Sequence, residues 1–154
     1  MAKISAKHEF IARRRVARKL SLMAAYQWQL NGDDFYDIYT YYQQDDAMAA
    51  DLRKADVSYF KALVDYVVEY EDELLEVFNG YLDLALTQIG PIERCVLLLG
   101  TTELKNHPEV DYKTSVNEWV NLAKKFGPEQ SFRFINGVLD KVAHQLRADE
   151  IDKK

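Results

Sequence analysis

Apolar residues recur along most of the chain at intervals of three and four, the spacing that places side chains on one face of an α-helix. In the first long segment such a face is predicted up to Gly32, a residue typical of helix ends. The members of that face are Ala12, Val16, Leu20, Met23, Gln27 and Leu30. No strictly alternating segment is bounded by turn residues on both sides, so no β-sheet is predicted.

Capping residues divide the next part of the chain into further helices. Asp33 or Asp34 is placed to cap a second helix, and Asp56 is placed to cap a longer one. Between them, residues 45–55 have the weakest pattern and are expected to form a loop or a short helix. A separate amphipathic piece follows at residues 74–78.

Glycine–proline pairs at 90–91 and 127–128 punctuate the second half, each ending one helix and starting the next. Ser115 and Glu118 have the spacing of a capping box and are expected to open one helix. The last helix is expected to begin at the second of these prolines and to run to Leu146. The predicted fold class is therefore all-α, a compact bundle of about seven helices.

Length and composition fit one domain that spans the 154 residues, with residues 1–12 as a flexible or partly ordered extension. The longest apolar run, residues 95–99, is far shorter than the roughly 20 residues of a membrane span. No apolar stretch of signal-peptide type follows the basic N-terminus. With a single cysteine, no internal disulfide is expected, and a cytoplasmic location is predicted.

Charge is distributed unevenly along the chain. The net charge is −5, yet residues 1–19 carry seven cations and one acid, a net +6. Residues 33–76 carry thirteen acids and three cations, a net −10. The basic end is expected to attract polyanions and the acidic segment a basic partner. The alternative is an ordinary solvated surface with a loose basic tail.

Residue types that carry enzyme chemistry do not form recognisable patterns. The three histidines lack metal-ligand spacing to one another and to Cys95, and that thiol is expected to be buried and inert. Paired acids stand at helix starts or in loops, where capping and solvation explain them. No glycine-rich phosphate loop is present. We therefore predict no catalytic site, no metal and no cofactor.

The basic end suggests a binding surface. Arg14 and Arg18 are four residues apart and are predicted to face away from the apolar stripe, with Arg15 and Lys19 beside them. Four cations along one helix would form a strip that binds phosphates. The alternative is a helix end that only adds solubility.

The last predicted helix carries two stripes. One is a core face, namely Ile135, Leu139, Val142 and Leu146. The other is largely polar and consists of Gln130, Phe134, Val138, Lys141 and Gln145, with Arg133 beside Phe134. An exposed ring next to cations and an amide suits an unstacked RNA base. The alternative is that Phe134 packs inside the bundle, and Phe126 is open to the same two interpretations.

Two motifs near the C-terminus identify a family resemblance. They read Leu-Ala-Lys-Lys-Phe-Gly at 122–127 and Asn-Gly-Val-Leu-Asp-Lys at 136–141. The arginine cluster followed by Tyr-Gln-Trp-Gln-Leu at 26–30 is similar to the first helix of the same family. Over nearly its whole length the chain resembles the NusB transcription antitermination factors.

The resemblance implies an all-α fold of two three-helix-like halves, with no enzymatic activity. It implies binding, together with the ribosomal protein NusE, to single-stranded boxA RNA of nascent ribosomal transcripts, alongside other Nus factors and RNA polymerase. It places partner contacts on Tyr26 and Glu93. Combined with the stripes above, the expected RNA-binding residues are Arg14, Arg15, Arg18, Phe126, Gln130, Arg133, Phe134 and Lys141.

The chain departs from the family where Leu98 and Thr102 replace a common arginine and tyrosine, and the tyrosine-rich segment 33–55 matches least well. Those tyrosines are expected to fill a helix interface. One alternative is the NusB-like RNA-binding domain of ribosomal RNA cytosine methyltransferases. Another is a protein-binding helical scaffold, and a homodimer is an open alternative for the oligomeric state.

Overall fold

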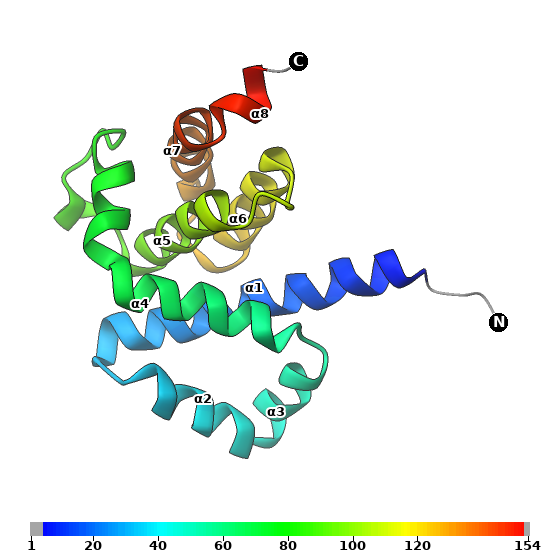
Figure 1. Ribbon diagram of the computed structural model, residues 1–154. Helices are drawn as coiled ribbons and strands as arrows, with labels where there is room; N and C mark the ends of the chain where they lie inside the picture. Colours follow the sequence, from blue (N-terminus) through cyan, green and yellow to red (C-terminus); the bar gives the residue numbers. More distant parts are fainter. Residues whose placement is uncertain (1–4, 153–154) are drawn as a thin grey trace. The chain divides into compact units, whose positions relative to one another are not determined.

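The computed structural model describes residues 5–152, and every regular element in that range is a helix (Figure 1). This confirms the predicted all-α class. The range holds eight α-helices and one 3-10 turn, one more α-helix than expected, because a short helix follows the last predicted one. They are α1 (Ala6–Asn31), α2 (Phe35–Gln44), α3 (Asp46–Arg53), α4 (Val57–Asn79), η1 (Leu86–Gln88), α5 (Pro91–Asn106), α6 (Tyr112–Phe126), α7 (Ser131–Leu146) and α8 (Ala148–Asp152).

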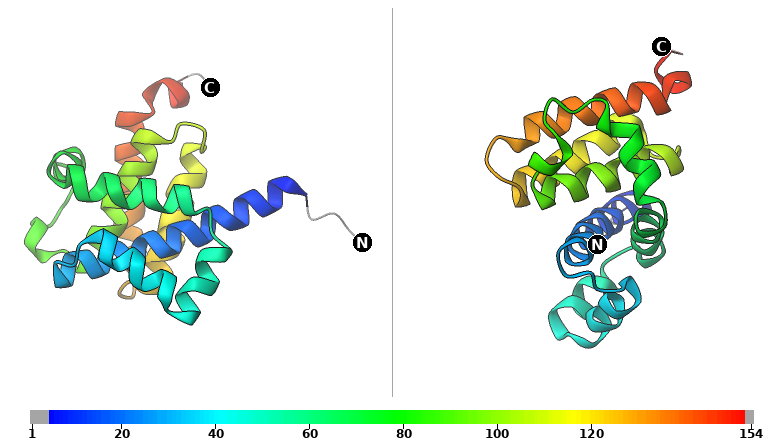
Figure 2. Two further views of the ribbon diagram at one scale, coloured as in Figure 1. Left: turned by 60° about the horizontal axis from the view of Figure 1, so that its bottom comes forward. Right: turned by 90° about the vertical axis from the view of Figure 1, so that its left-hand side faces the viewer.

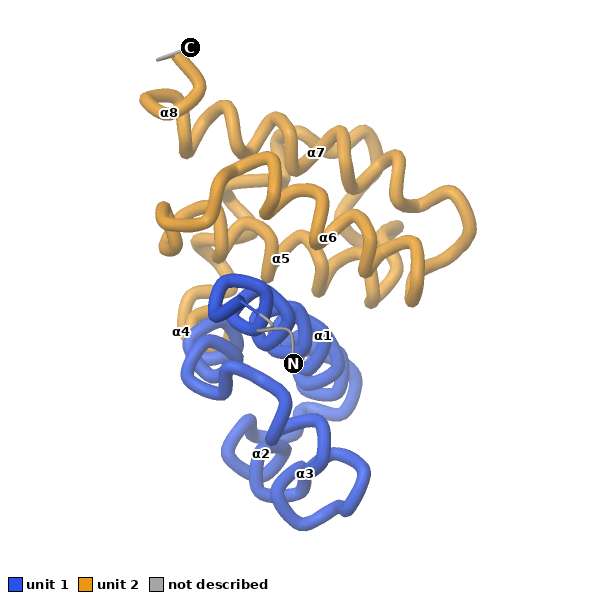
Figure 3. Tube along the Cα trace, turned by 90° about the vertical axis from the view of Figure 1, so that its right-hand side faces the viewer, with its two compact units in different colours: residues 1–65 blue, residues 66–154 orange. Residues whose placement is uncertain are grey.

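The chain divides into two compact units, which meet along the sequence inside α4 between Asp65 and Tyr66 (Figure 3). The first unit contains α1 to α3 and the beginning of α4, and the second contains the remaining elements. Helix α4 bends at Tyr70, whose backbone leaves the helical region at φ −121° and ψ 32°. The segment that follows Asp56 and the amphipathic piece at 74–78 are thus parts of one bent helix.

An aromatic cluster forms the core of the first unit. Phe60 of α4 is fully buried and packs edge-on against Phe35 of α2, with ring centroids 5.5 Å apart. Tyr42 stacks on the same ring at 6.3 Å, and burial raises the pKa of this phenol to about 12. The expected interface role of the tyrosines is therefore right for Tyr42. It is wrong for Tyr36 and Tyr41, which are exposed at the surface of α2.

Short polar side chains begin these helices where the sequence predicts them. The carboxylate of Asp34 accepts from the N–H of Tyr36 at the start of α2, and Asp56 accepts from the N–H of Tyr59 in α4. Gly32 ends α1 in the left-handed conformation at φ +70°, which a residue without Cβ adopts readily. Residues 45–55 contain the short helix α3, so the helical alternative is correct there.

The beginning of α1 lies within the stretch that the sequence predicts as a flexible or partly ordered extension. The helix starts at Ala6, and the hydroxyl of Ser5 caps it by accepting from the N–H of His8 at 3.1 Å. Residues 6–12 are helical as the first turns of a helix that continues to Asn31, and residues 1–4 lie outside the described range. The predicted apolar face is correct at Leu20, but Ala12 and Leu30 near the two ends are exposed.

Helix α5 forms the centre of the second unit, where it packs against α6 and α7 (Figures 1 and 2). Its residues 95–104 are all buried. At Gly100 an added Cβ would lie 3.0 Å from the side chain of Leu139, so this glycine permits the close approach of α7. Leu98 and Thr102, the two positions that differ from the common family residues, are both buried. The threonine hydroxyl donates to the Leu98 carbonyl, so neither side chain is part of the surface.

Two predicted helix starts in this unit are wrong. Helix α6 begins at Tyr112, because the carboxylate of Asp111 caps it, and Ser115 therefore lies inside the helix. Its hydroxyl instead donates to the buried carboxylate of Glu103, which also accepts from the indole of Trp119. The last helix, α7, begins at Ser131 and not at the proline three residues earlier, and it ends at Leu146 as predicted.

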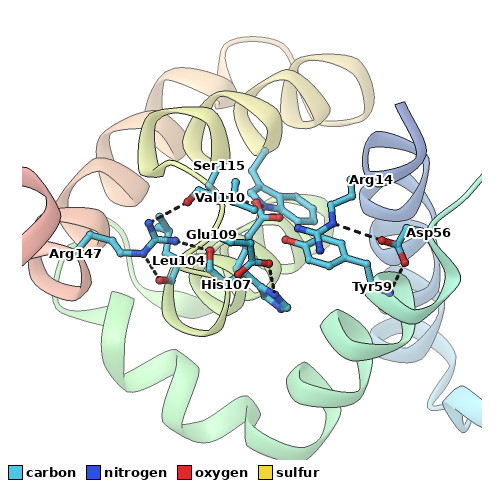
Figure 4. A network of polar contacts seen from close by, with 11 residues as sticks. Arg14, Asp56, Tyr59, Leu104, His107, Glu109, Val110, Ser115 and Arg147 are labelled. Atoms are coloured by element: carbon cyan, nitrogen blue, oxygen red, sulfur yellow. Dashed lines mark hydrogen bonds and ion pairs between the residues drawn. The ribbon is translucent and has the colours of Figure 1, made fainter. Parts of the chain in front are cut away.

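A buried arginine fastens the chain after α7 to the loop between α5 and α6 (Figure 4). Arg147 is 6% exposed and donates to the backbone carbonyls of Leu104, His107 and Val110 at 2.6, 2.9 and 3.0 Å. It also forms an ion pair of 2.6 Å with Glu150. The planar guanidinium with its several donors suits a site that presents several carbonyls.

Candidate nucleic-acid interface

Arg14 in the first unit is held between two aromatic rings. Its guanidinium carbon lies 3.8 Å from the ring centroid of Tyr59 and 4.5 Å from that of Phe10. Its Nε lies 3.5 Å from a carboxylate oxygen of Asp56, and the side chain is only 15% exposed (Figure 4). Stacking and the ion pair fix the plane of this cation and leave only a small part of the side chain exposed.

Arg18 corrects the predicted strip of cations. It was expected to face away from the core, but it is 4% exposed, with its guanidinium carbon 5.8 Å from the Tyr59 ring. The periodicity misled because the buried side of α1 is built largely from small residues, which a search for large apolar side chains overlooks. These are Ala17, Ser21, Ala24 and Ala25.

The cation of this cluster that is displayed most openly is Arg15, which is exposed. Lys19 is partly exposed, and its ammonium lies 3.9 Å from a carboxylate oxygen of Asp51. Arg13 donates to the carbonyls of Arg53 and Ala55 and so helps to hold the start of α4. Fewer cations are therefore displayed than the four expected. Arg15 is the main one, and Arg14 beside it is only slightly exposed.

The turn between α6 and α7 in the second unit displays rings and cations together. Phe126 is 38% exposed, with the ammonium of Lys125 5.5 Å from its ring centroid. Gly127 follows, and an added Cβ there would lie 2.8 Å from the Ala123 carbonyl oxygen and 3.0 Å from the Ser131 hydroxyl. The turn is thus tight enough to bring the end of α6 close to the start of α7.

The same turn contains an aromatic residue that the sequence analysis missed. Phe132 has the ammonium of Lys124 4.8 Å from its ring centroid and the guanidinium carbon of Arg133 5.7 Å away. Gln130 and Arg133 are exposed, and Phe134 is half-buried. The signal that could have revealed Phe132 was present, namely an aromatic between cations on the same short stretch.

The polar stripe predicted along α7 is interrupted. Val138 belongs to the core at 3% exposure, together with Ile135, Leu139 and Val142, whereas Leu146 is half-buried. Lys141 lies beyond that interruption and lines an open pocket with Tyr81, Asp140, His144 and Gln145. Two turns of helix, about 10 Å, separate it from Phe134, so the two belong to different parts of the surface.

The two expected partner contacts are half-buried. Tyr26 lies on α1 in the first unit, and Glu93 lies in the first turn of α5 in the second. One carboxylate oxygen of Glu93 is buried and accepts no hydrogen bond from the residues that the structure describes. Its neighbour Arg94 forms an ion pair of 3.0 Å with Glu71.

Among the residues that the structure describes, the cysteine thiol and the metal-binding residue types can be assessed for enzyme chemistry. Cys95 is fully buried, and that burial raises the pKa of its thiol to about 12, as expected for an inert thiol. Across residues 5–152, His, Cys, Asp and Glu side chains do not gather in groups of three or more that suit a metal ion. Within the same range, each helix is too short or too polar to cross a bilayer.

Comparison with known proteins identifies the family. The model of the NusB family matches residues 15–144. The chain belongs to the NusB family. The transcription antitermination protein NusB of Nitrosomonas eutropha is 40% identical over 139 residues, which cover 90% of this chain and 81% of that protein. NusB of Ralstonia pickettii is also 40% identical, over 90% of this chain and 86% of its own length.

Solved NusB structures have the same fold. The structure of T. maritima NusB matches with a TM-score of 0.70 at 24% identity and covers 84% of this chain and 89% of that one. A crystal structure of the antitermination factors NusB and NusE in complex with dsRNA matches with a TM-score of 0.70 at 25% identity. That match covers 85% of this chain and 96% of the solved one.

Proposed function

We propose that this chain is a transcription antitermination factor that binds boxA-type single-stranded RNA together with the ribosomal protein NusE. It acts in the cytoplasm without catalysis, alongside other Nus factors and RNA polymerase, and supports processive transcription of ribosomal RNA. The observation that carries the proposal is the display of rings and cations around Phe126 and Phe132 in a NusB-family chain. A relative of the same fold is known in complex with NusE and RNA.

The proposed RNA contacts combine three kinds of chemistry. Rings of Phe126, Phe132 and Phe134 offer stacking faces, and the exposed amide of Gln130 offers hydrogen bonds to a base edge. Lysines and arginines beside the rings neutralise phosphates, and Arg15 with the exposed part of Arg14 does so on α1. Lys141 is assigned an outlying phosphate contact. Arg18 is assigned no RNA contact, because its side chain is buried.

The proposed partner contacts use Tyr26 and Glu93, both of which are half-buried. A ribosomal protein is expected to be basic, and residues 33–76 carry a net −10. That charge favours fast encounter with a basic partner at low ionic strength.

A titration of RNA against the full chain tests the proposal. We expect tighter binding to a boxA RNA than to a scrambled RNA of the same composition, and a further gain in affinity when NusE is added. Equal binding to the two RNAs with normal NusE binding would instead support a protein-binding scaffold. Sequence preference that NusE does not change would support a stand-alone RNA-binding domain.

Arg15→Ala is expected to weaken RNA binding and to change the free energy of unfolding by less than about 0.5 kcal/mol, because this side chain is exposed. Affinity for single-stranded RNA falls with salt by about 0.7 log units per neutralised phosphate for each tenfold rise. The variant should therefore show a slope shallower by about that amount. Affinities measured across a salt series check this, with Arg53→Ala as an exposed arginine outside the proposed contacts. An unchanged dependence of affinity on salt would show that Arg15 does not contact RNA.

Phe134→Leu is expected to cost about 1–3 kcal/mol of RNA binding, because leucine lacks the flat face on which a base stacks. The half-buried position should tolerate the change with under about 1.5 kcal/mol lost from the free energy of unfolding, since apolar volume is largely kept. RNA titration and urea unfolding on the same protein separate the two effects. Leu139→Ala is the core control and should lose about 2–5 kcal/mol of stability. Normal RNA affinity in Phe134→Leu would show that this ring packs within the helical bundle and does not contact RNA.

A further inference from the structure

The first two turns of α1 form an exposed helical arm that the proposed function does not use. Every residue from 5 to 12 is exposed, and Phe10 at 50% and Ile11 at 36% are large apolar side chains in that stretch. The NusB family model begins at residue 15, so the arm precedes the part that matches the family.

Phe10 is the outer member of a three-layer stack. The guanidinium of Arg14 lies between the rings of Phe10 and Tyr59, with centroid distances of 4.5 and 3.8 Å. Tyr59 is buried at 4% exposure and anchored in α4, and its N–H donates to the carboxylate of Asp56 that also pairs with Arg14. The stack is therefore fixed at its inner end, and its outer end is an aromatic ring open to solvent.

The charges around the ring favour a polyanion. Lys7, Phe10 and Arg14 follow one another at helical spacings of three and four, so they share one face of the arm. Glu9, the only acid among residues 5–15, falls on the opposite face by the same spacing. An open ring between two cations offers stacking to a base and neutralisation to the phosphates on both sides of it.

We propose that Phe10 is an additional stacking platform for single-stranded RNA, which binds a nucleotide just outside the boxA segment. This extends the RNA site onto the arm of α1, and it rests on the proposed function for the choice of RNA. Arg14 is a positioning residue, because its guanidinium stacks on the Phe10 ring and holds it in place. The ring takes any base, since every base offers a flat face.

The experiment measures the binding of three RNAs to the full chain: boxA alone, boxA lengthened on the 5′ side, and boxA lengthened on the 3′ side. Each extension has about four nucleotides, near the lower limit of the site sizes known for single-strand binding. We expect the wild-type chain to bind one lengthened RNA more tightly than boxA alone. Phe10→Ala should lose that gain in affinity, which we expect to be roughly five- to tenfold. This is near the lower end of the effect of one stacked base, because the ring lies at the surface. It should bind the short RNA like wild type.

Two matched variants make the result specific. Phe10→Tyr keeps a stacking face and should retain the gain, and Ile11→Ala removes a neighbouring apolar side chain that has no ring and should also retain it. A fluorescent base analogue in the lengthened segment should be quenched by the wild-type chain and by Phe10→Tyr, but not by Phe10→Ala. Alanine is a strong helix former, so loss of the arm does not confound the comparison.

The outcomes separate this inference from the proposed function. If Phe10→Ala binds all three RNAs like wild type while boxA is still preferred over a scrambled RNA, the platform is wrong and the proposed function stands. If Phe10→Ala weakens only the binding of NusE, the arm is a protein-docking surface and the inference is overturned. If boxA preference is absent but lengthened RNA of either sequence depends on Phe10, the platform stands and the proposed function fails.

Discussion

Arg147→Ala is expected to lower the free energy of unfolding by about 3–5 kcal/mol, the largest single effect predicted for this chain. The substitution removes one buried cation and leaves the carbonyls of Leu104, His107 and Val110 without their donor. It also leaves Glu150 without its ion pair. Urea unfolding followed by circular dichroism measures the loss.

Two comparisons show that the loss comes from this hydrogen-bonding network. Arg133→Ala removes an exposed arginine at the other end of α7 and should change stability by less than about 0.5 kcal/mol. Arg147→Lys keeps the charge but cannot reach all the carbonyls, so an intermediate loss is expected. RNA affinity of the folded fraction should stay normal, because the length of α7, about 24 Å, separates Arg147 from the turn at Gly127. A wild-type unfolding midpoint in Arg147→Ala would show that the network contributes no net stability.

Arg18→Ala is expected to cost roughly 3 kcal/mol of stability, because it truncates a long side chain at a buried position of α1. Its RNA affinity at low temperature should equal that of the wild-type chain, since a side chain with 4% exposure does not reach a phosphate. Thermal melts and RNA titrations on this variant and on Arg15→Ala should give opposite patterns. Arg15→Ala keeps stability and loses affinity.

A second substitution at the same position keeps the test decisive if Arg18→Ala fails to fold. Arg18→Met keeps much of the buried apolar stem without the charge and should therefore destabilise the chain less than alanine does. It should bind RNA with the same salt dependence as wild type. A shallower slope in Arg18→Met would place this arginine in the RNA interface after all.

The helical class and most helix ends followed from local chemistry. The caps at Asp34 and Asp56 and the left-handed glycine at Gly32 depend only on a side chain or a backbone conformation within a few residues. The core face of α7 at Ile135, Leu139 and Val142 was likewise visible, because large apolar residues at helical spacing are usually buried. These features need no knowledge of what packs against the helix.

Local patterns failed where a stronger contact from another element competed. Ser115 and Glu118 have the spacing of a capping box, but the carboxylate of Asp111 caps the helix four residues earlier. The serine hydroxyl instead donates a hydrogen bond to Glu103, a buried acid twelve residues away in sequence. No local pattern reveals this contact. Buried polar groups of this kind are placed by their partners, and those partners come from other helices.

Three properties can be read from the residues alone: the all-helical class, the ends of most helices, and the family. Which cations are displayed depends on packing between helices. Arg14 is stacked between rings, Arg18 is buried and Arg15 is exposed, although all three are charged and close in sequence. The same packing brings Lys124 of α6 to the ring of Phe132 in α7. The physical reason is that helix formation depends on neighbours along the chain, whereas the exposure of a side chain depends on which other helix covers it.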